Sequence, residues 1–165
     1  TLDVFYSFPI ILLAIGIAAA LGPGLTNIMI SATIVFIPPI ARIAETAVKE
    51  VRKEEYIEAA VSSGASIGFI IRKAILPNVS NRLFVYCSSQ VSICLIVASG
   101  LSFLGLGVSP PTAEWGFMLN NLKQIMFINP ILTIIPGVFI FLTSLAFNIV
   151  SEGIADALET AEGAK

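Results

Sequence analysis

The polar side chains that could carry chemistry gather at two places in this sequence. The first is an acidic cluster beside small residues, made of Glu54, Glu55, Glu58, Ala59, Ala60 and Gly64. Carboxylates form strong hydrogen bonds with cationic or amide groups of a partner, and small alanines permit close approach, so this group suits docking. The second lies inside an apolar run and consists of Ser88, Ser89, Gln90 and Ser92. Their donors and acceptors must meet protein or water, because lipid offers neither.

The sequence lacks the residues that most enzymes and metal sites use. It contains no histidine, which is the commonest general base and the commonest metal ligand. Its two cysteines, Cys87 and Cys94, stand in an apolar run at a spacing that suits neither a disulfide framework nor a zinc clip. The glycines of residues 100–107 are not followed by the lysine of a phosphate-binding loop. We therefore expect no catalytic residue, no metal site and no bound nucleotide in this chain.

The composition indicates that lipid is the solvent of this chain. Only 12% of the 165 residues are charged, against about 25% in an ordinary soluble domain. The mean hydropathy is +0.94. A soluble fold of about 150 residues buries only about 70% of the surface that its unfolded chain exposes, so it could not remove this much apolar area from water. The net charge of −2 argues against nucleic acid as a partner, because that partner needs a broad basic face.

Four apolar stretches predict an all-α, polytopic membrane bundle. They cover residues 4–21, 25–43, 83–106 and 125–150. A bilayer core of about 30 Å needs roughly 20 residues of helix, so the last two stretches are long enough. The first two, separated by a glycine and proline turn at 22–24, are marginal. A buried hairpin of a large soluble protein is the alternative interpretation.

The distribution of basic residues predicts the orientation of these spans. Seven of the nine basic residues lie at the end of the second stretch or between it and the third, namely Arg42, Lys49, Arg52, Lys53, Arg72, Lys73 and Arg82. Loops on the cytoplasmic side carry such an excess of Lys and Arg. The loop 44–82 is then cytoplasmic, and residues 22–24 and 107–121 face outward. Both ends of the chain are expected on the inner side.

The cytoplasmic loop is itself predicted to be helical. Apolar residues recur at three- and four-residue spacing over 40–51, so the second span continues outward as an amphipathic helix. A short helix over 54–63 follows and stops at Gly64, which can adopt the left-handed conformation that ends a helix. A third helix over 65–74 ends near Pro77. Periodicity leaves two interpretations open: a loop packed under its own bundle, or a helix inserted into a groove of a cytoplasmic partner.

Several short blocks of this sequence resemble those of a known protein family. Glu58-Ala59-Ala60, Gly64 and Ile75-Leu76-Pro77 together are similar to the EAA signature of ABC importer permeases, the membrane subunits of ATP-driven uptake systems. Further blocks make the resemblance specific to the dipeptide and oligopeptide permeases of the DppC/OppC type. They are Glu55-Tyr56-Ile57-Glu58-Ala59-Ala60, Gly64-Ala65-Ser66, Ile75-Leu76-Pro77-Asn78, Leu101-Ser102-Phe103-Leu104-Gly105-Leu106-Gly107-Val108, Pro110-Pro111-Thr112, Trp115-Gly116 and Leu145-Ala146-Phe147-Asn148.

The resemblance implies a type I, MetI-like permease domain whose coupling helix, near residues 58–64, sits in a cleft of an ATPase subunit. The coupling residues that it implies are Glu55, Tyr56, Glu58, Ala59, Ala60, Gly64, Leu76 and Pro77. It also implies ABC ATPase subunits that bind ATP and Mg²⁺, a second homologous permease and an extracytoplasmic substrate-binding protein. The setting would be the cytoplasmic membrane of a prokaryote. Because such permeases have more spans than this chain, we expect about two further spans before Thr1.

The resemblance leaves the substrate open. Ala74, Ala98 and Glu45 stand where the family usually has a histidine, a glutamate and a basic residue. Dipeptides, longer peptides, nickel chelates and some sugars are all handled by related systems. The alternative class is an ATP-independent secondary carrier or a channel, although the predicted spans hold no charged residues that could relay protons.

The route of the substrate and the outer loop are further open points. Ser88, Ser89, Gln90 and Ser92 either line the route or hold neighbouring helices together. Gln90 is the best single candidate for the route, because its amide both donates and accepts hydrogen bonds. On the outer side, residues 105–121 are expected to form an irregular loop with a short helix over 113–123. Trp115 would then lie at headgroup depth or against the binding protein.

Overall fold

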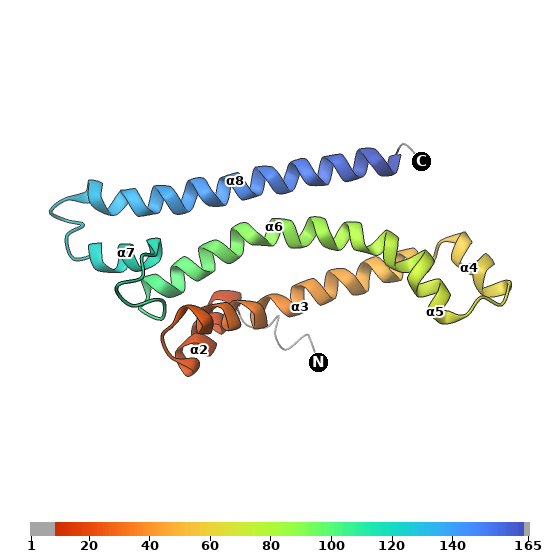
Figure 1. Cartoon of the computed structure of the whole chain (residues 1–165), viewed down its shortest axis with the longest axis horizontal. Helices are drawn as coiled ribbons and strands as arrows, with labels where there is room; N and C mark the ends of the chain where they lie inside the picture. The colour runs from red at the N-terminus through yellow and green to blue at the C-terminus, as the bar shows by residue number, and fades with distance from the viewer. Residues whose placement is uncertain (1–8, 164–165) are drawn as a thin grey trace. The chain divides into compact units, whose positions relative to one another are not determined.

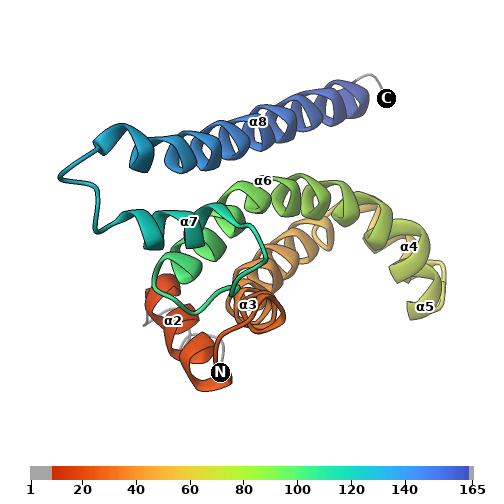
Figure 2. The same cartoon turned by 60° about the vertical axis from the view of Figure 1, so that its left-hand side comes forward.

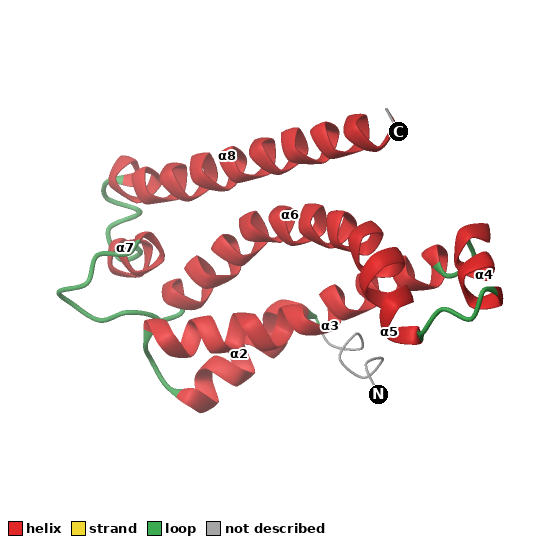
Figure 3. Cartoon of the chain, turned by 45° about the vertical axis from the view of Figure 1, so that its right-hand side comes forward, coloured by secondary structure: helices red, strands yellow, loops and turns green. Residues whose placement is uncertain are grey.

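The computed structural model describes residues 9–163 and consists of helices joined by loops (Figure 3). In chain order the elements are α2 (Ile10–Leu21), α3 (Leu25–Val51), α4 (Glu55–Ser62), α5 (Ile67–Ile70), the π-helical turn η1 (Ile71–Ile75), α6 (Leu76–Phe103), α7 (Trp115–Leu122) and α8 (Pro130–Gly163). The described part of the chain contains no strand, which confirms the all-α prediction.

Within the part of the chain that the structure describes, three helical stretches are long and apolar enough to cross a membrane, namely Leu25–Val51, Ile67–Phe103 and Pro130–Leu158. Figure 1 shows them as the long ribbons α3, α5 to α6, and α8. Helix α2 is also apolar but has 12 residues, fewer than the roughly 20 that a bilayer needs. Residues 4–8 of the first predicted span lie outside the described residues.

The chain divides into two compact units. One unit comprises Thr1–Pro38 and Gln90–Val150, and the other comprises Pro39–Ser89 and Ser151–Lys165. Helices α3, α6 and α8 each contribute to both units. The acidic cluster belongs to the second unit, whereas α7 and the loops on either side of it belong to the first.

The turn between α2 and α3 has the tight geometry that its glycines predict. Gly22 has a φ of +86°, a left-handed conformation that costs glycine little. The side-chain amide of Asn27 donates to the carbonyls of Leu21 and Gly22, each at 3.0 Å. The N–H of Gly24 donates to the carbonyl of Leu106 at 3.2 Å. These bonds attach the turn to the segment that follows α6.

The helix over 65–74 does not end near Pro77, so that prediction is wrong. Elements α5, η1 and α6 instead form one helical run over 67–103. The π turn explains the difference, because the N–H of Leu76 donates to the carbonyl of Ile71, five residues back. A wider turn accommodates a proline, which has no N–H and whose ring would clash in a regular α-helix.

Helix α7 packs on α6 with backbone against backbone. A β-carbon at Gly116 would lie 2.2 Å from the carbonyl oxygen of Ser99, so a residue without one is required here. Glu114 caps the helix, since its two carboxylate oxygens accept from the N–H groups of Gly116 at 2.9 Å and Phe117 at 2.8 Å. The helix lies within the predicted range 113–123, and Figure 2 shows it beside α6.

Helix α8 begins at Pro130 rather than at the predicted residue 125. Residues 125–129 form a turn, in which the N–H groups of Ile128 and Asn129 donate to the carbonyl of Ile125 at 2.9 and 2.8 Å. Proline suits the first position of a helix, because the missing N–H would have no partner there and φ is already fixed. The helix then continues to Gly163, beyond the predicted end at 150.

Candidate functional site

Helix α4, which carries the acidic cluster, packs by one face on a small hydrophobic core. This core cluster consists of Ala47, Val51, Ile57, Ile70 and Val79. Ile57 is the member from α4, and its side chain is only 5% exposed. The other members come from α3, α5 and α6, so α4 rests on the ends of two long helices (Figure 1). Burying a side chain such as Ile57 stabilises this arrangement by about 1.5–3 kcal/mol.

The opposite face of α4 is exposed. Glu55, Glu58 and Ala59 all lie on it. Ala60, in contrast, is partly buried against the core cluster. The two alanines of the signature therefore have different surroundings. One face of α4 packs against helices of its own chain, as expected for a loop packed under its own bundle. The other face exposes acidic and small residues, as expected for a helix that docks to a partner.

Gly64 follows the C-terminal end of α4 and has the left-handed conformation predicted for it. Its φ is +78°. The N–H of Gly64 donates to the carbonyl of Val61 at 3.0 Å, and the N–H of Ala65 donates to the carbonyl of Ala60 at 3.1 Å. This pair of bonds is the Schellman motif, which satisfies the last carbonyls of a helix. The chain can then reverse toward α5.

A side-chain hydrogen bond joins α4 to α6. The amide nitrogen Nδ2 of Asn78 donates to the phenolic oxygen of Tyr56 at 3.0 Å. One turn further along α6, Arg82 forms an ion pair with Glu50 of α3. Asn78, Arg82 and Glu50 were not predicted as site residues, because the partners in these two contacts are 22 and 32 residues apart in the sequence. Two sequence signals pointed to them: Asn78 ends the block Ile75-Leu76-Pro77-Asn78, and its four-residue spacing from Arg82 places the two on one helix face.

Leu76 and Pro77 complete the set of predicted coupling residues. They lie in the first turn of α6, directly after η1. Both side chains are exposed, that of Leu76 by 54%. Their position is on the helical run that leads from α4 toward the apolar part of α6.

The four polar residues of α6, Ser88, Ser89, Gln90 and Ser92, differ in their surroundings. The hydroxyl of Ser88 donates to the carbonyl of Phe84, and that of Ser89 donates to the carbonyl of Tyr86, each at 2.8 Å. Both bonds stay within α6, as is usual for serine in an apolar helix. Gln90 is half-buried.

Ser92, unlike its neighbours, joins two helices. Its hydroxyl donates to the carbonyl of Ser144 in α8 at 2.9 Å, and the hydroxyl of Ser144 donates back to the carbonyl of Ser92 at 3.4 Å. Ser92 is 6% exposed. This exchange is an interhelical contact, which is one of the two roles predicted for these polar residues.

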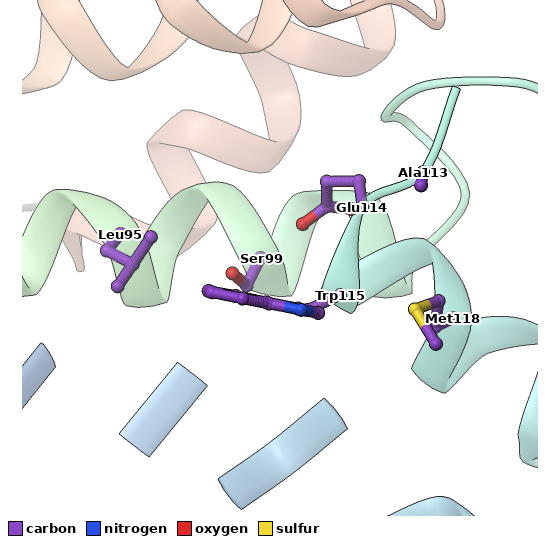
Figure 4. A pocket seen from close by; sticks show the side chains of 6 residues that line it. All are labelled: Leu95, Ser99, Ala113, Glu114, Trp115 and Met118. Atoms are coloured by element: carbon purple, nitrogen blue, oxygen red, sulfur yellow. The ribbon is translucent and has the colours of Figure 1, made fainter. Parts of the chain in front are cut away.

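A pocket of about 390 Å³ lies between α6 and α7 in the first unit (Figure 4). It is lined by Leu95, Ser99, Ala113, Glu114, Trp115 and Met118. The indole of Trp115 stacks on Phe139 of α8, with ring centroids 5.7 Å apart and planes inclined by 15°. Trp115 is therefore half-buried against protein. The described residues contain no cluster of three or more metal-ligating side chains.

Comparison with protein families decides the affiliation. The model of the family described as "Binding-protein-dependent transport system inner membrane component" matches residues 1–161. The chain belongs to this family. Membership confirms the resemblance to ABC importer permeases. The family consists of membrane components of transport systems and is not an enzyme family. A carrier or channel of another class is not favoured.

Curated proteins of similar sequence are named as permeases of a transport system. The "Glutathione transport system permease protein GsiD" of Escherichia coli O1:K1 / APEC is 42% identical over 157 residues, which cover 95% of this chain and 52% of the relative. The proteins of the same name from Shigella flexneri serotype 5b (strain 8401) and Shigella sonnei (strain Ss046) give the same values. The chain therefore spans about half the length of the curated relatives it matches.

Proposed function

We propose that this chain is part of the permease subunit of an ATP-driven importer and that α4 is its coupling helix. The observation that carries the proposal is the two-sided environment of α4. Ile57 anchors one face in the core cluster, while Glu55 and Glu58 remain exposed on the other. A short helix that is fixed to two long helices and open to a partner suits the transfer of movement into a membrane.

The proposal requires several partners. ABC ATPase subunits would receive the acidic face of α4 and would bind ATP and Mg²⁺, for which the sequence of this chain has no phosphate-binding loop. A second homologous permease would complete the translocation route, and an extracytoplasmic substrate-binding protein would deliver the substrate. The basic residues on the loop 44–82 favour its cytoplasmic placement. Both ends of this chain would then lie on the inner side of a prokaryotic cytoplasmic membrane.

Peptides are the proposed substrate class. The sequence blocks resemble dipeptide and oligopeptide permeases, and the relatives carry the name of glutathione transport, glutathione being a tripeptide. The side-chain amide of Gln90 on α6 suits a peptide backbone, because it both donates and accepts hydrogen bonds. Uptake by the complete transporter in proteoliposomes should follow glutathione or short peptides. Uptake of nickel or a sugar, without uptake of any peptide, would contradict the proposed substrate class but not the assignment as an importer.

The test of the coupling role is co-purification of the full-length subunit from its native membrane in mild detergent. ATPase subunits should accompany the unaltered protein and be lost on Glu58→Lys, which reverses a charge on the exposed face of α4. The matched control is Glu45→Lys, another exposed carboxylate, which pairs with Lys49 within α3 at 2.6 Å and contributes little there. A subunit that purifies alone and transports without ATP would overturn the proposal.

A further inference from the structure

Asn78 stands at a junction of three elements. Its Nδ2 donates to Tyr56 of α4 at 3.0 Å and to the carbonyl of Ala74 in η1 at 2.7 Å. A side-chain amide nitrogen carries two hydrogens, so these two bonds use both of them. One nitrogen atom of α6 therefore links the exposed short helix to the π turn.

The surroundings of this junction limit how α4 can move on its own. Ile57, next to Tyr56, is buried with Val79, which follows Asn78. Arg82 lies one turn beyond Asn78 and pairs with Glu50 of α3. A displacement of α4 therefore acts on α6 through an apolar contact and, one residue away, through a directional hydrogen bond.

The π turn is the element on which such a displacement would act. It interrupts the helical run over 67–103 at residues 71–75, where one backbone bond reaches five residues back. Single π turns inside α-helices occur often at functional sites. The bond from Asn78 to Ala74 spans the end of this turn.

We propose that Tyr56 and Asn78 are positioning residues that pass the movement of α4 to the π turn and so to α6. The inference rests on the proposed function, because it takes α4 as the helix that the ATPase moves. In this proposal Tyr56 acts through its hydrogen bond to Asn78 of the same chain. The alternative is a direct contact of the Tyr56 hydroxyl with the ATPase, since the Tyr56 side chain is 45% exposed.

The test uses the complete transporter in proteoliposomes, with its ATPase, second permease and binding protein, and glutathione as the substrate. The quantity measured is the number of substrate molecules taken up for each ATP hydrolysed. Tyr56→Phe removes the hydroxyl. Asn78→Ser removes the reach to Tyr56 but keeps a hydroxyl that can donate to the carbonyl of Ala74, as Ser88 does to Phe84.

Each single variant should lower this ratio by about two- to tenfold, which is the range expected for one hydrogen bond. The double variant should be no worse than either single variant, because both remove the same bond. The control is Ser80→Ala, which lies two residues from Asn78 on α6 but whose hydroxyl donates to the carbonyl of Pro77 in its own helix at 3.0 Å. Its ratio should be unchanged.

Two outcomes would overturn the inference. An unchanged ratio in Tyr56→Phe would show that the bond passes on no movement. Additive losses in the double variant would assign Tyr56 to a direct contact with the ATPase. The amount of co-purified ATPase, measured in every variant, separates loss of assembly from loss of transmission. Failure of the proposed function itself looks different, because the unaltered complex would then show no ATP-dependent uptake.

Discussion

The α-carbon of Gly116 lies directly against the carbonyl of Ser99, where a β-carbon would meet the oxygen at 2.2 Å. The nearby ring of Trp115 stacks on Phe139. Helix α7 is thereby held to α6 on one side and to α8 on the other, all within one unit. Glycine is the residue that permits the first contact, and an aromatic pair supplies the second.

Gly116→Ala should destabilise the packing of α7 on α6. Backbone must shift to admit the methyl group, and overpacking of this kind costs about 1–3 kcal/mol. The matched control is Gly100→Ala, since Gly100 follows Ser99 in the same helix and its β-carbon would meet nothing within 4 Å. Thermal unfolding of the full-length subunit in detergent measures both. Equal Tm values for the two variants would contradict the contact.

Ser92 and Ser144 should contribute a modest amount to the contact between α6 and α8. Hydrogen bonds between membrane helices average about 0.6 kcal/mol, because the separated helices also find partners. Ser92→Ala should therefore lower the free energy of unfolding by about that amount, and Ser92→Leu by more, since the site is buried. Ser88→Ala serves as the control, because its hydroxyl bonds within its own helix. A loss in Ser88→Ala as large as that in Ser92→Ala would refute the interhelical role.

Helix content and the features that local chemistry dictates were predictable from the sequence. Gly64 was predicted to end a helix, and its φ of +78° agrees. The continuation of the helix through Pro77 was not predictable. The rule that proline ends a helix is a local one, and it does not hold after a π turn. The pairing of Tyr56 with Asn78 was also out of reach, since contact across 22 residues depends on how the helices pack.

The conformation of Gly64 predicts opposite effects for two alanine substitutions. Gly64→Ala should destabilise the cap of α4 by about 1–2 kcal/mol, because a side chain disfavours left-handed backbone. Gly68→Ala lies in the helix α5, has no neighbour within 4 Å, and should stabilise it by about 0.5–1 kcal/mol. Amide hydrogen exchange over residues 55–66 should rise about 5- to 30-fold in the first variant. It should not rise in the second, and a parallel rise in both would show that the cap is unimportant.

The proposed orientation predicts which loops an impermeant thiol reagent can reach. Cys87 is exposed and Cys94 half-buried, so both are first replaced by alanine. Thr112→Cys places a thiol in the exposed loop before α7, and Ser62→Cys places one at the exposed end of α4. In intact cells expressing the full-length subunit without its ATPase, the reagent should label the cysteine at 112 and spare the cysteine at 62. Inside-out vesicles should reverse the pattern, because the excess of basic residues places the loop 44–82 inside. Labelling of the cysteine at 62 from outside would invert the topology and remove α4 from the reach of any cytoplasmic ATPase.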